Sequence, residues 1–461
     1  MNKNKSHTFI IIWILIIVSE SSFSQNYATG CLKENQAYLE NSVSFDLRKS
    51  VYDFLPESFS LKEYCPTPTS QGEQGSCVGF ATAYSARTIL FNIKNNTTDS
   101  DFSSNNAFSP SYVYNQIKMY DCGNGSRLTD ALKLLQNQGC LPVYKFLYDS
   151  KSCNKIPSVL EKENASDFKI LDYRSLKDDG EISINKIKKA LYSLNPVVIS
   201  IDVYQSFQET KGDLWNGVKD VKGQGHAISI VGYDDERYGG VFELMNSWDN
   251  DWADNGFVCV KYTDLLKICD EAYELIESSN TSSQEFSANV TFVLQTSDKI
   301  TMNQISPNVF QSSEPLISGT NMQILLDNHQ PMYLYIFSTD DTRKVQILFP
   351  PDDKISPLMP YQNNPIVIPG EDYFAQMDNT IGTDVICILY SKKKLDFQNL
   401  QIRLDGMSGE LYSNIKYILG NKILSASEVK CNSSNQYLNT NFSAKSATGE
   451  MLLVSYRFKH H

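Results

Sequence analysis

The sequence predicts an α+β protein in which a two-lobed domain, with a helical lobe and a β-barrel-like lobe, precedes an all-β, sandwich-like domain. Three observations lead to this fold class. Long helical segments without proline occupy the first half of residues 55–276, and short β-rich runs fill its second half. Beyond residue 287, nearly every apolar run has the length and composition of a strand. A helical half that packs on a β half is expected to leave a cleft between the two.

The helical half contains two clear segments. "CVGFATAYSARTILFNI" begins at Cys77 and has no proline, and "LTDALKLLQNQG" offers Thr129 as a possible N-cap and Gly139 as a stop. Strands are expected in "PVVISIDVY", "HAISIVGYDD", "GVFELMNSW" and "GFVCVKY".

Residues 277–287, "ESSNTSSQEFS", have the composition of a linker. The β-rich region that follows, residues 288–461, includes "VTFVLQ", "PMYLYIFS", "KVQILF", "NPIVIPG" and "DVICILY". Its last run alternates apolar and polar residues, as a half-buried strand does: Val454, Tyr456 and Phe458 against Ser455, Arg457 and Lys459. A sandwich fits this region best.

The N-terminus predicts export. The basic "MNKNKSH" precedes an apolar stretch of eleven residues, "TFIIIWILIIV", and Ser22 and Ser24 occupy small-residue positions before a cut. A membrane-spanning helix needs about 20 apolar residues, so residues 1–24 are interpreted as a signal peptide cleaved near Ser24–Gln25. A lipoprotein cut before Cys31 and an uncleaved anchor are weaker alternatives. Residues 25–54 remain as a short N-terminal segment.

Composition limits the partners and cofactors. In an exported chain the ten cysteines would more often pair than stay free, and Cys122 with Cys153 is the candidate pair. A net charge of −12 without a Lys/Arg stripe argues against nucleic acid as a partner. No His/Cys cluster has metal-ligand spacing, and we predict neither a metal nor another cofactor.

Cys77 is the first candidate for chemistry. A thiol attacks as its thiolate, and the unsatisfied N–H groups of a helix beginning at Cys77 would face the sulfur and lower its pKa. Gly72 and Gly75 allow a close backbone approach at that point. The alternative is a structural cysteine at a helix start.

One histidine is placed to act as a base. His226 is the only histidine between Cys77 and the linker, because the other four are His7, His329, His460 and His461. Gly223 and Gly225 precede it and leave room beside the ring. The alternative is a packed core histidine next to an apolar strand.

Asn246 is a candidate for orienting that histidine. An imidazole that works with a thiolate needs an acceptor that fixes its tautomer, and an Asn provides one without adding charge. Trp248 could shield the Asn–His bond from water. The alternative is a polar strand end before an Asp/Asn-rich turn.

Together the three stretches resemble the papain-like cysteine peptidases, over roughly residues 55–276, and the motifs favour a secreted bacterial branch. "QGEQGSCVGFA" resembles the nucleophile motif of that family, "GHAISIVGYD" its histidine strand and "NSWDNDWADNGF" its asparagine–tryptophan motif. The order Cys…His…Asn also agrees.

The resemblance implies a role for each matching residue. Cys77 would be the nucleophile, His226 its ion-pair partner and general acid, and Asn246 the residue that orients His226. The Gln71 side chain and the Cys77 backbone N–H would form the oxyanion hole. Trp248 and Trp252 would line the leaving-group side.

Substrate-binding residues are implied in the same way. Asn124, Gly125 and Ser126 match the glycine strip beside the S2 and S3 subsites, although Ser126 replaces the usual second Gly. Gly225 is a further substrate-binding candidate. Glu274 could lie at the base of S2, but a structural carboxylate is the commoner case.

The chain also departs from the family pattern. Gln74 stands where the family has a paired Cys, Val78 replaces an aromatic residue, and Cys269 has no assigned partner. The segment of residues 25–54 is shorter than the usual inhibitory propeptide, so either latency is achieved differently or the enzyme folds active. The C-terminal region, with "YLYIFSTDDTRKVQILFP", resembles an uncharacterised β-rich accessory domain of secreted bacterial proteins.

These features predict a secreted bacterial cysteine endopeptidase that acts on proteins or peptides through a thioester on Cys77. One alternative is a catalytically silent peptidase fold used for binding or adhesion. Another is acyl transfer or amidase chemistry with the same triad.

Overall fold

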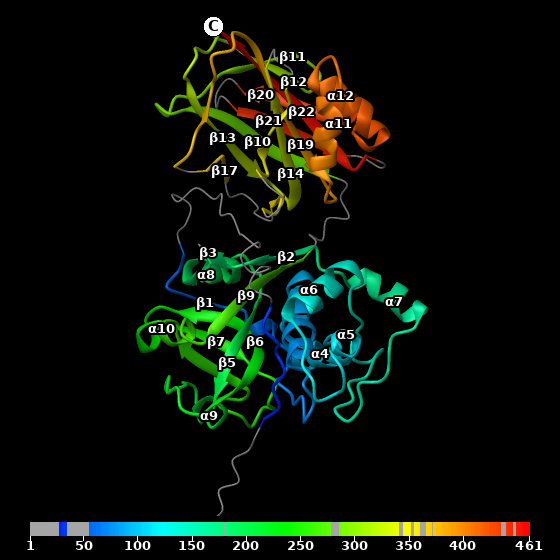
Figure 1. The fold of residues 1–461 in the computed structure, drawn as a ribbon, viewed down its shortest axis with the longest axis vertical. Coiled ribbons are helices and arrows are strands. Elements are labelled where there is room, and N and C mark those ends of the chain that lie inside the picture. Colours follow the sequence, from blue (N-terminus) through cyan, green and yellow to red (C-terminus); the bar gives the residue numbers. More distant parts are fainter. Residues whose placement is uncertain are drawn as a thin grey trace, which may run out of the picture.

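The structure is a computed structural model that describes residues 27–34, 55–178, 180–277, 285–340, 344–351, 355–359, 366–370, 372–434, 439–445 and 449–461. The predicted signal peptide, residues 1–24, and most of residues 25–54 lie outside the described residues. Figure 1 shows two bodies, one ending with β9 and the other beginning with β10.

The first helix of the N-terminal body begins at Cys77, as predicted. α2 (Cys77–Gly79), the π-helical η3 (Phe80–Arg87) and α3 (Thr88–Lys94) follow one another without a break. The remaining helices of this half are α4 (Ser100–Asn105), α5 (Pro110–Ile117), α6 (Leu128–Asn137) and α7 (Val159–Ala165), with short 3₁₀ turns η2 (Lys62–Tyr64) and η4 (Ser166–Phe168).

The ends of α6 test the predicted cap and stop. Gly139 follows the helix with φ +84°, a conformation that favours glycine, so the predicted stop is confirmed. The predicted cap at Thr129 is wrong: Arg127, with extended backbone, is the N-cap, and Thr129 lies buried inside the first turn. The buried Leu128 and Leu132 fix where the helix starts, and this packing outweighs the cap preference.

The second half of the N-terminal body is one antiparallel sheet, in the order β2-β9-β5-β6-β7-β8 with β1 beside β6. Its strands are β1 (Ser58–Ser60), β2 (Asp172–Ser175), β5 (Val197–Tyr204), β6 (Lys222–Asp234), β7 (Val241–Met245), β8 (Phe257–Lys261) and β9 (Cys269–Ile276). All four strands predicted for this half are confirmed. In the described part of the chain, the end strands β2 and β8 do not pair with each other, so the sheet is open.

Smaller elements connect these strands. They are β3 (Lys177–Asp178), β4 (Glu181–Ile182), α8 (Ile184–Tyr192), α9 (Gln205–Gln208), η5 (Arg237–Gly239) and α10 (Tyr262–Leu265). One hydrophobic core lies mainly within the sheet, and a second lies between the helices and the sheet and includes Cys77 and Ala227.

The C-terminal body contains two sheets around a common core. The first has the order β17-β13-β10-β21-β20 and the second β11-β12-β22-β19-β14-β15. The strands are β10 (Glu285–Leu294), β11 (Met302–Ser306), β12 (Val309–Ser312), β13 (Asn321–Asn328), β14 (Met332–Thr339), β15 (Gln346–Phe349), β16 (Leu358–Met359), β17 (Ile366–Ile368), β18 (Ala375–Gln376), β19 (Gly382–Ser391), β20 (Val429–Ser434), β21 (Asn439–Lys445) and β22 (Met451–His460). Phe292 and Leu326 of the first sheet pack with Tyr456 of the second, as in a sandwich.

Two helices of this body were not predicted, because the region was expected to be all β. α11 (Phe397–Asp405) and α12 (Leu411–Leu419), with the 3₁₀ turns η6 (Gly420–Lys422) and η7 (Ala426–Glu428) after them, cover the outer face of the second sheet. Each main helix has only nine residues, so its apolar period is hard to separate from that of the surrounding strands. As a result Ser455, expected on an exposed face of β22, is buried.

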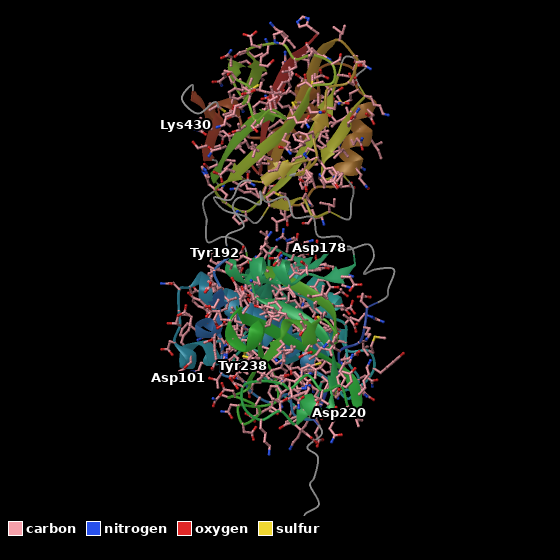
Figure 2. The ribbon with its side chains drawn as sticks, turned by 90° about the vertical axis from the view of Figure 1, so that its left-hand side faces the viewer. Asp101, Asp178, Tyr192, Asp220, Tyr238 and Lys430 are labelled. Carbon is pink, nitrogen blue, oxygen red and sulfur yellow. A yellow bond between two sulfur atoms is a disulfide. The ribbon has the colours of Figure 1, made fainter. Side chains whose placement is uncertain are left out.

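The boundary between the two bodies also differs from expectation. β10 begins at Glu285, inside the segment expected to be a linker, and residues 278–284 lie outside the described residues. Ile276 packs with Tyr333 and Leu358, and the Ser356 hydroxyl donates to Asp172 Oδ2 over 3.1 Å. Figure 2 shows the two bodies from the side, with Asp178 and Tyr192 near their junction.

The cysteines are mostly free. Cys122 and Cys153 form the predicted disulfide, with an S–S distance of 2.06 Å. The other eight are unpaired, so the expectation that most cysteines pair is wrong for the described residues. Seven of these, including Cys77 and Cys269, are buried in the interior.

Candidate active site

Cys77 lies where the chain turns into a helix. Its N-cap, Ser76, makes no side-chain cap bond, because the Ser76 hydroxyl instead hydrogen-bonds the Tyr148 hydroxyl at 2.9 Å. The N–H groups of the first turn are thus left to face the thiol. Burial raises the pKa of Cys77 to about 12, while the backbone N–H groups of Ala227, Val78 and Gly30 act in the opposite direction.

His226 is held by Asn246 from the other side. Both side chains are buried, and His226 Nε2 lies 2.8 Å from Asn246 Oδ1, which also accepts the Ser247 N–H at 2.8 Å. Since an amide oxygen can only accept, Nε2 carries the proton and Nδ1 is left as an acceptor. Nδ1 has no partner among the described residues. The backbone N–H of Ala227 hydrogen-bonds the Cys77 sulfur. His226, which carries the unpartnered Nδ1, is the residue directly before Ala227.

Two tryptophans cover this pair. The Trp248 ring stacks on the His226 ring with centroids 4.6 Å apart and a 28° angle between the planes. Trp252 packs edge-on against Trp248 at 5.1 Å. Both rings are almost fully buried, so water is kept from the Asn246–His226 bond, as the sequence predicted.

Burial favours the neutral forms of Cys77 and His226 in this closed site. Burial lowers the pKa of His226 to about 4, an effect that the hydrogen bond donated by His226 to Asn246 only partly offsets. With the Cys77 pKa near 12, thiol and imidazole are both neutral at neutral pH. The physical reason is desolvation, which disfavours the charged form of each group.

Gln71 is anchored close to Cys77 and Asn246. Its Oε1 accepts from the Ser247 hydroxyl at 2.6 Å, and its Nε2 donates to the Gln74 carbonyl at 2.8 Å. A primary amide has two hydrogens, so one remains available to a substrate oxygen. Gln74, which stands where a paired Cys was expected, is buried and donates to the Asp149 carbonyl.

Residues 27–34, which we call the strap, lie between the helical half and the sheet (Figure 1, dark blue). The N–H groups of Gly30 and Cys31 both donate to the Gly225 carbonyl, at 3.1 and 2.9 Å. On the opposite side Ser126 N–H donates to the Gly30 carbonyl at 2.9 Å, and Leu32 N–H donates to the Ser126 carbonyl at 3.0 Å. Cys31 and Ser126 are thereby paired in parallel, as in a short ladder.

The glycines predicted around the site are needed for the strap to fit. A Cβ on Gly125 would come within 1.8 Å of the Gly30 carbonyl oxygen, and one on Gly225 within 2.3 Å of the Cys31 oxygen. A Cβ on Gly30 itself would lie 2.5 Å from the Gly75 oxygen. Three backbones meet here at distances that only glycine allows.

The two ends of the strap contact different parts of the site. At its N-terminal end the Tyr27 ring stacks on Trp248 with centroids 4.9 Å apart, and Trp248 Nε1 donates to the Ala28 carbonyl at 3.0 Å. At its C-terminal end the Cys31 thiol donates to the Ser200 hydroxyl at 3.3 Å, and Glu34 N–H donates to the buried Glu271 carboxylate at 3.0 Å.

The structure does not place Glu274 with these residues. Its carboxylate is buried, accepts from Arg174 Nε at 2.9 Å and from Asn195 Nδ2 at 2.9 Å, and forms an ion pair with Arg174. These buried contacts agree with the alternative interpretation of Glu274 as a structural carboxylate. Residues alternate faces along β9, so Glu271 rather than Glu274 faces Ser200 and the strap.

The remaining predicted residues are close together. Asn124 and Gly125 precede Ser126 on the strap-binding segment, and the Cys122 carbonyl accepts from Gly75 N–H at 3.0 Å. Sequence reasoning missed the strap, Ser200, Ser247 and Glu271. Ser247 stands inside the "NSWDNDWADNGF" motif but was given no role there. No motif marked the strap, Ser200 or Glu271, although the small residues of "ATGC" around Gly30 are compatible with a tightly packed segment.

The described part of the chain contains no group of three or more His, Cys, Asp or Glu side chains placed to hold a metal ion. Among the described helices, none is both long enough and apolar enough to cross a membrane.

Comparison with known proteins identifies the N-terminal body. The family described as "Papain family cysteine protease" matches residues 55–276. A viral cathepsin of Adoxophyes honmai nucleopolyhedrovirus is 25% identical over 231 residues, which are 48% of this chain and 61% of the relative. Mouse cathepsin K is 26% identical over 211 residues, 44% of this chain and 59% of the relative. The matches thus span about three fifths of each relative.

Among solved structures, xylellain, a cysteine protease from Xylella fastidiosa, aligns with a TM-score of 0.44 and 22% identity, covering 54% of this chain and 96% of that protein.

Proposed function

Because residues 55–276 form a papain-family cysteine protease domain, we propose that this chain is an exported bacterial cysteine endopeptidase that hydrolyses protein or peptide substrates. The observation that carries the proposal is the buried His226–Asn246 pair. His226 Nδ1 has no partner among the described residues, and the N–H of the next residue, Ala227, contacts the Cys77 sulfur. The basic and apolar N-terminal segments of the sequence support export.

The proposed reaction uses the neutral pair as a proton-transfer couple. Once the site is open to solvent, the Cys77 proton moves to His226 Nδ1, and the thiolate attacks the substrate carbonyl carbon. The second Gln71 amide hydrogen and the Cys77 N–H stabilise the oxyanion. Protonated His226 then gives its proton to the leaving amine, and a thioester remains on Cys77.

The second half-reaction restores the enzyme. His226, now neutral, takes a proton from a water molecule that attacks the thioester carbonyl. The carbon–sulfur bond breaks, the acid leaves, and Cys77 recovers its proton. Asn246 accepts from Nε2 throughout, so the ring keeps its plane while its charge changes.

We also propose that the strap keeps the enzyme latent. In a substrate, the acyl part before the scissile bond would lie along Asn124–Ser126, and the leaving part would follow toward Trp248. The strap runs in the opposite direction, with Tyr27 at Trp248 and Leu32 at Ser126. The strap therefore fills the cleft, while its Ala28 and Gly30 carbonyls accept hydrogen bonds from Trp248 and Ser126. It also excludes the water that the ion pair requires.

The test is product analysis on the full reduced chain with a protein substrate, using mass spectrometry. Internal cleavage with uptake of one oxygen from H₂¹⁸O supports endopeptidase activity. Cross-linked or amine-transferred products would instead assign acyl transfer, which uses the same thioester. If the Gly30→Val variant, in which the strap no longer fits, binds peptides but releases no product, the chain is a binding protein and the proposal fails.

A further inference from the structure

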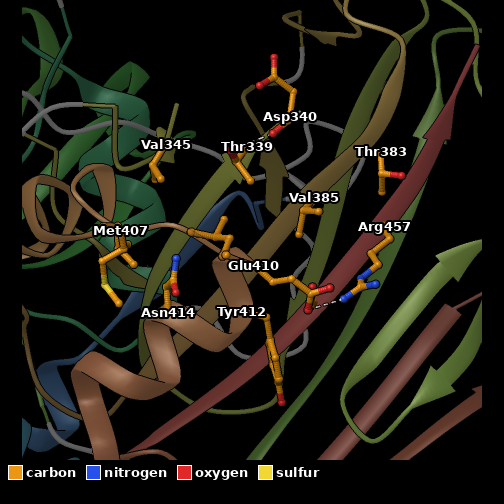
Figure 3. A pocket seen from close by; sticks show the side chains of 14 residues that line it. Thr339, Asp340, Val345, Thr383, Val385, Met407, Glu410, Tyr412, Asn414 and Arg457 are labelled. Atoms are coloured by element: carbon orange, nitrogen blue, oxygen red, sulfur yellow. Dashed lines mark hydrogen bonds and ion pairs between the residues drawn. The ribbon is translucent and has the colours of Figure 1, made fainter. Parts of the chain in front are cut away.

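A cavity of about 310 Å³ lies in the C-terminal body, between the second sheet and the beginning of α12 (Figure 3). Its size is at the lower end of the range of small-molecule pockets. It is far from Cys77 in the fold, because it is built only by residues that follow residue 338. Its walls come from β14, β19 and β22 on one side and from α11, α12 and the turn between them on the other.

The polar floor of the cavity contains buried groups without partners. Ser455 is fully buried, and its Oγ lies beside the Cys387 thiol but has no nitrogen or oxygen partner among the described residues. Arg457, two residues further along β22, has a buried Nε that also lacks a partner there. Buried polar groups are nearly always hydrogen-bonded, so this pair indicates a ligand that accepts hydrogen bonds.

The start of α12 adds to the positive character of this floor. Glu410 is the N-cap of the nine-residue helix, but its side chain makes no cap bond to the first-turn N–H groups. Instead Glu410 Oε2 accepts from Arg457 Nη2 at 2.8 Å, as the dashed line in Figure 3 marks. The helix N-terminus therefore leaves N–H groups at the cavity that favour an anion.

The remaining walls are apolar. Val385, Leu404 and Leu411 line the cavity together with Val345 and Met407. Thr383 and Asn414 contribute polar groups at its sides. Asp340 points away from the Glu410–Arg457 pair. The lining thus combines the Arg457 guanidinium, which Glu410 pairs, with a branched aliphatic surface and the hydroxyls of Thr339, Thr383, Tyr412 and Ser455. This combination fits an acid with a short apolar body.

Glu410 shows how the head group would bind. The Glu410 side chain is 61% exposed, and its carboxylate accepts from only one guanidinium nitrogen of Arg457, Nη2. The Arg457 Nε is left without a partner among the described residues. A guanidinium binds carboxylates best through two parallel N–H donors. A ligand carboxylate that takes Nε, Nη2 and the Ser455 hydroxyl makes more bonds than Glu410 does.

We propose that this cavity binds a carboxylate attached to a small branched aliphatic group, with Arg457 and Ser455 as the donors and Glu410 as an internal competitor that the ligand displaces. The same chemistry occurs at a peptide C-terminus ending in leucine or valine and in a short branched fatty acid. The two sources differ in the amide group next to the carboxylate-bearing carbon, which Thr383 and Asn414 can recognise.

The experiment is a calorimetric titration of the full chain with three probes. N-acetyl-leucine carries the carboxylate and the amide, N-acetyl-leucinamide lacks the charge, and 4-methylpentanoate lacks the amide. The proteins are the wild type, Glu410→Gln, Arg457→Gln, Ser455→Ala and, as a charge-matched control, Arg403→Gln on the exposed side of α11. Thermal unfolding of each variant reports whether it is folded.

We expect N-acetyl-leucine to bind the wild type at least about tenfold more tightly than N-acetyl-leucinamide, because the lost bonds involve charged groups. Glu410→Gln should tighten binding, Arg457→Gln should abolish it, Ser455→Ala should weaken it, and Arg403→Gln should leave it unchanged. Equal binding of 4-methylpentanoate identifies the fatty acid as the source, and weaker binding identifies the peptide terminus. The proposal is overturned if neither acid binds the wild type or Glu410→Gln, or if Glu410→Gln weakens binding.

Discussion

The candidate sites of the two bodies differ in what their polar groups contact. In the N-terminal body, the strap supplies main-chain partners. Gly30 and Cys31 donate to the Gly225 carbonyl, while Ser126 donates to Gly30 and accepts from Leu32. In the C-terminal body, Ser455 Oγ and Arg457 Nε line a cavity and have no partner among the described residues.

This difference indicates what each body recognises. Main-chain hydrogen bonds to Gly225 and Ser126 are the same for almost any peptide, so the first site should accept many sequences and must be kept closed by the chain itself. A fixed guanidinium and hydroxyl recognise one kind of head group. The following changes, from the largest expected effect to the smallest, should separate the two.

Cys77→Ala should remove the peptidase activity and leave the C-terminal body unaffected. Without the thiolate no thioester forms, and loss of a catalytic nucleophile lowers kcat by a factor of about 10⁴ or more. The measurement is hydrolysis of a fluorogenic peptide, with N-acetyl-leucine binding as the internal control. Retained hydrolysis would mean that another residue is the nucleophile.

Gln71→Ala should lower kcat by about a hundredfold, because one oxyanion donor is lost. Ser247 is the matched probe of position, since its hydroxyl holds Gln71 Oε1 at 2.6 Å. Ser247→Ala should therefore lower kcat less than Gln71→Ala does, with KM unchanged in both. An effect confined to KM would place Gln71 in ground-state binding instead.

Gly30→Val should activate the full chain. Any side chain at this position meets the Gly75 backbone, so the strap cannot close, and residues 55–276 are left unaltered. We expect the initial rate of peptide hydrolysis to rise about tenfold or more, since activity follows the open fraction. Gly406→Val is the control, because its Cβ would be 3.8 Å from the nearest atom. Equal initial rates in the wild type and Gly30→Val would show that the strap does not inhibit.

Acid should loosen the strap. Burial lowers the pKa of His226 to about 4 in the closed site, whereas an ordinary histidine has a pKa near 6.5. In Cys77→Ala, where no thiol can give the ring a proton, His226 is neutral in both states above pH 6.5, and pH does not affect closure there. Between pH 6.5 and about 4 only the open state takes up the proton, and closure weakens by up to about tenfold per pH unit.

Amide hydrogen exchange of Gly30 and Cys31, corrected for intrinsic rates, measures this loosening. In His226→Gln the dependence on pH should disappear. A corrected exchange rate that stays flat from pH 7 to pH 5 in Cys77→Ala would contradict the assignment to His226.

Glu410→Gln should have the smallest effect on catalysis. The cavity is built by residues after residue 338, so kcat/KM on a short peptide should stay within about twofold of the wild type, while binding of N-acetyl-leucine tightens. A large loss of peptidase activity would show that the two bodies are coupled.

Much of the candidate site could be predicted from the sequence because its chemistry depends on local motifs. Cys77 at a helix start, His226 on a strand and Asn246 before Trp248 each have a local signature. In the structure His226 contacts both Asn246 and Trp248. The strap could not be predicted, because its position rests on contacts between backbones far apart in sequence, such as Gly30 with Gly75.

The fold was predictable to a similar extent. Strands with several apolar residues, such as β5 and β22, were recognised, whereas the nine-residue helices α11 and α12 were not. Two carboxylates, Glu271 and Glu274, lie three residues apart on one strand and thus on opposite faces. The sequence alone does not determine which of the two faces the site.

The most direct test of the account is the rate at which iodoacetamide alkylates Cys77, measured against pH by peptide mass spectrometry. The full reduced chain is compared as wild type, Gly30→Val and Gly30→Val with His226→Ala. The account predicts slow alkylation of the wild type at pH 6, fast alkylation of Gly30→Val at the same pH, and loss of that reactivity in the double variant. If Cys77 of Gly30→Val reacts only above about pH 8, like an unperturbed thiol, no thiolate–imidazolium pair forms when the strap leaves, and the peptidase account is contradicted.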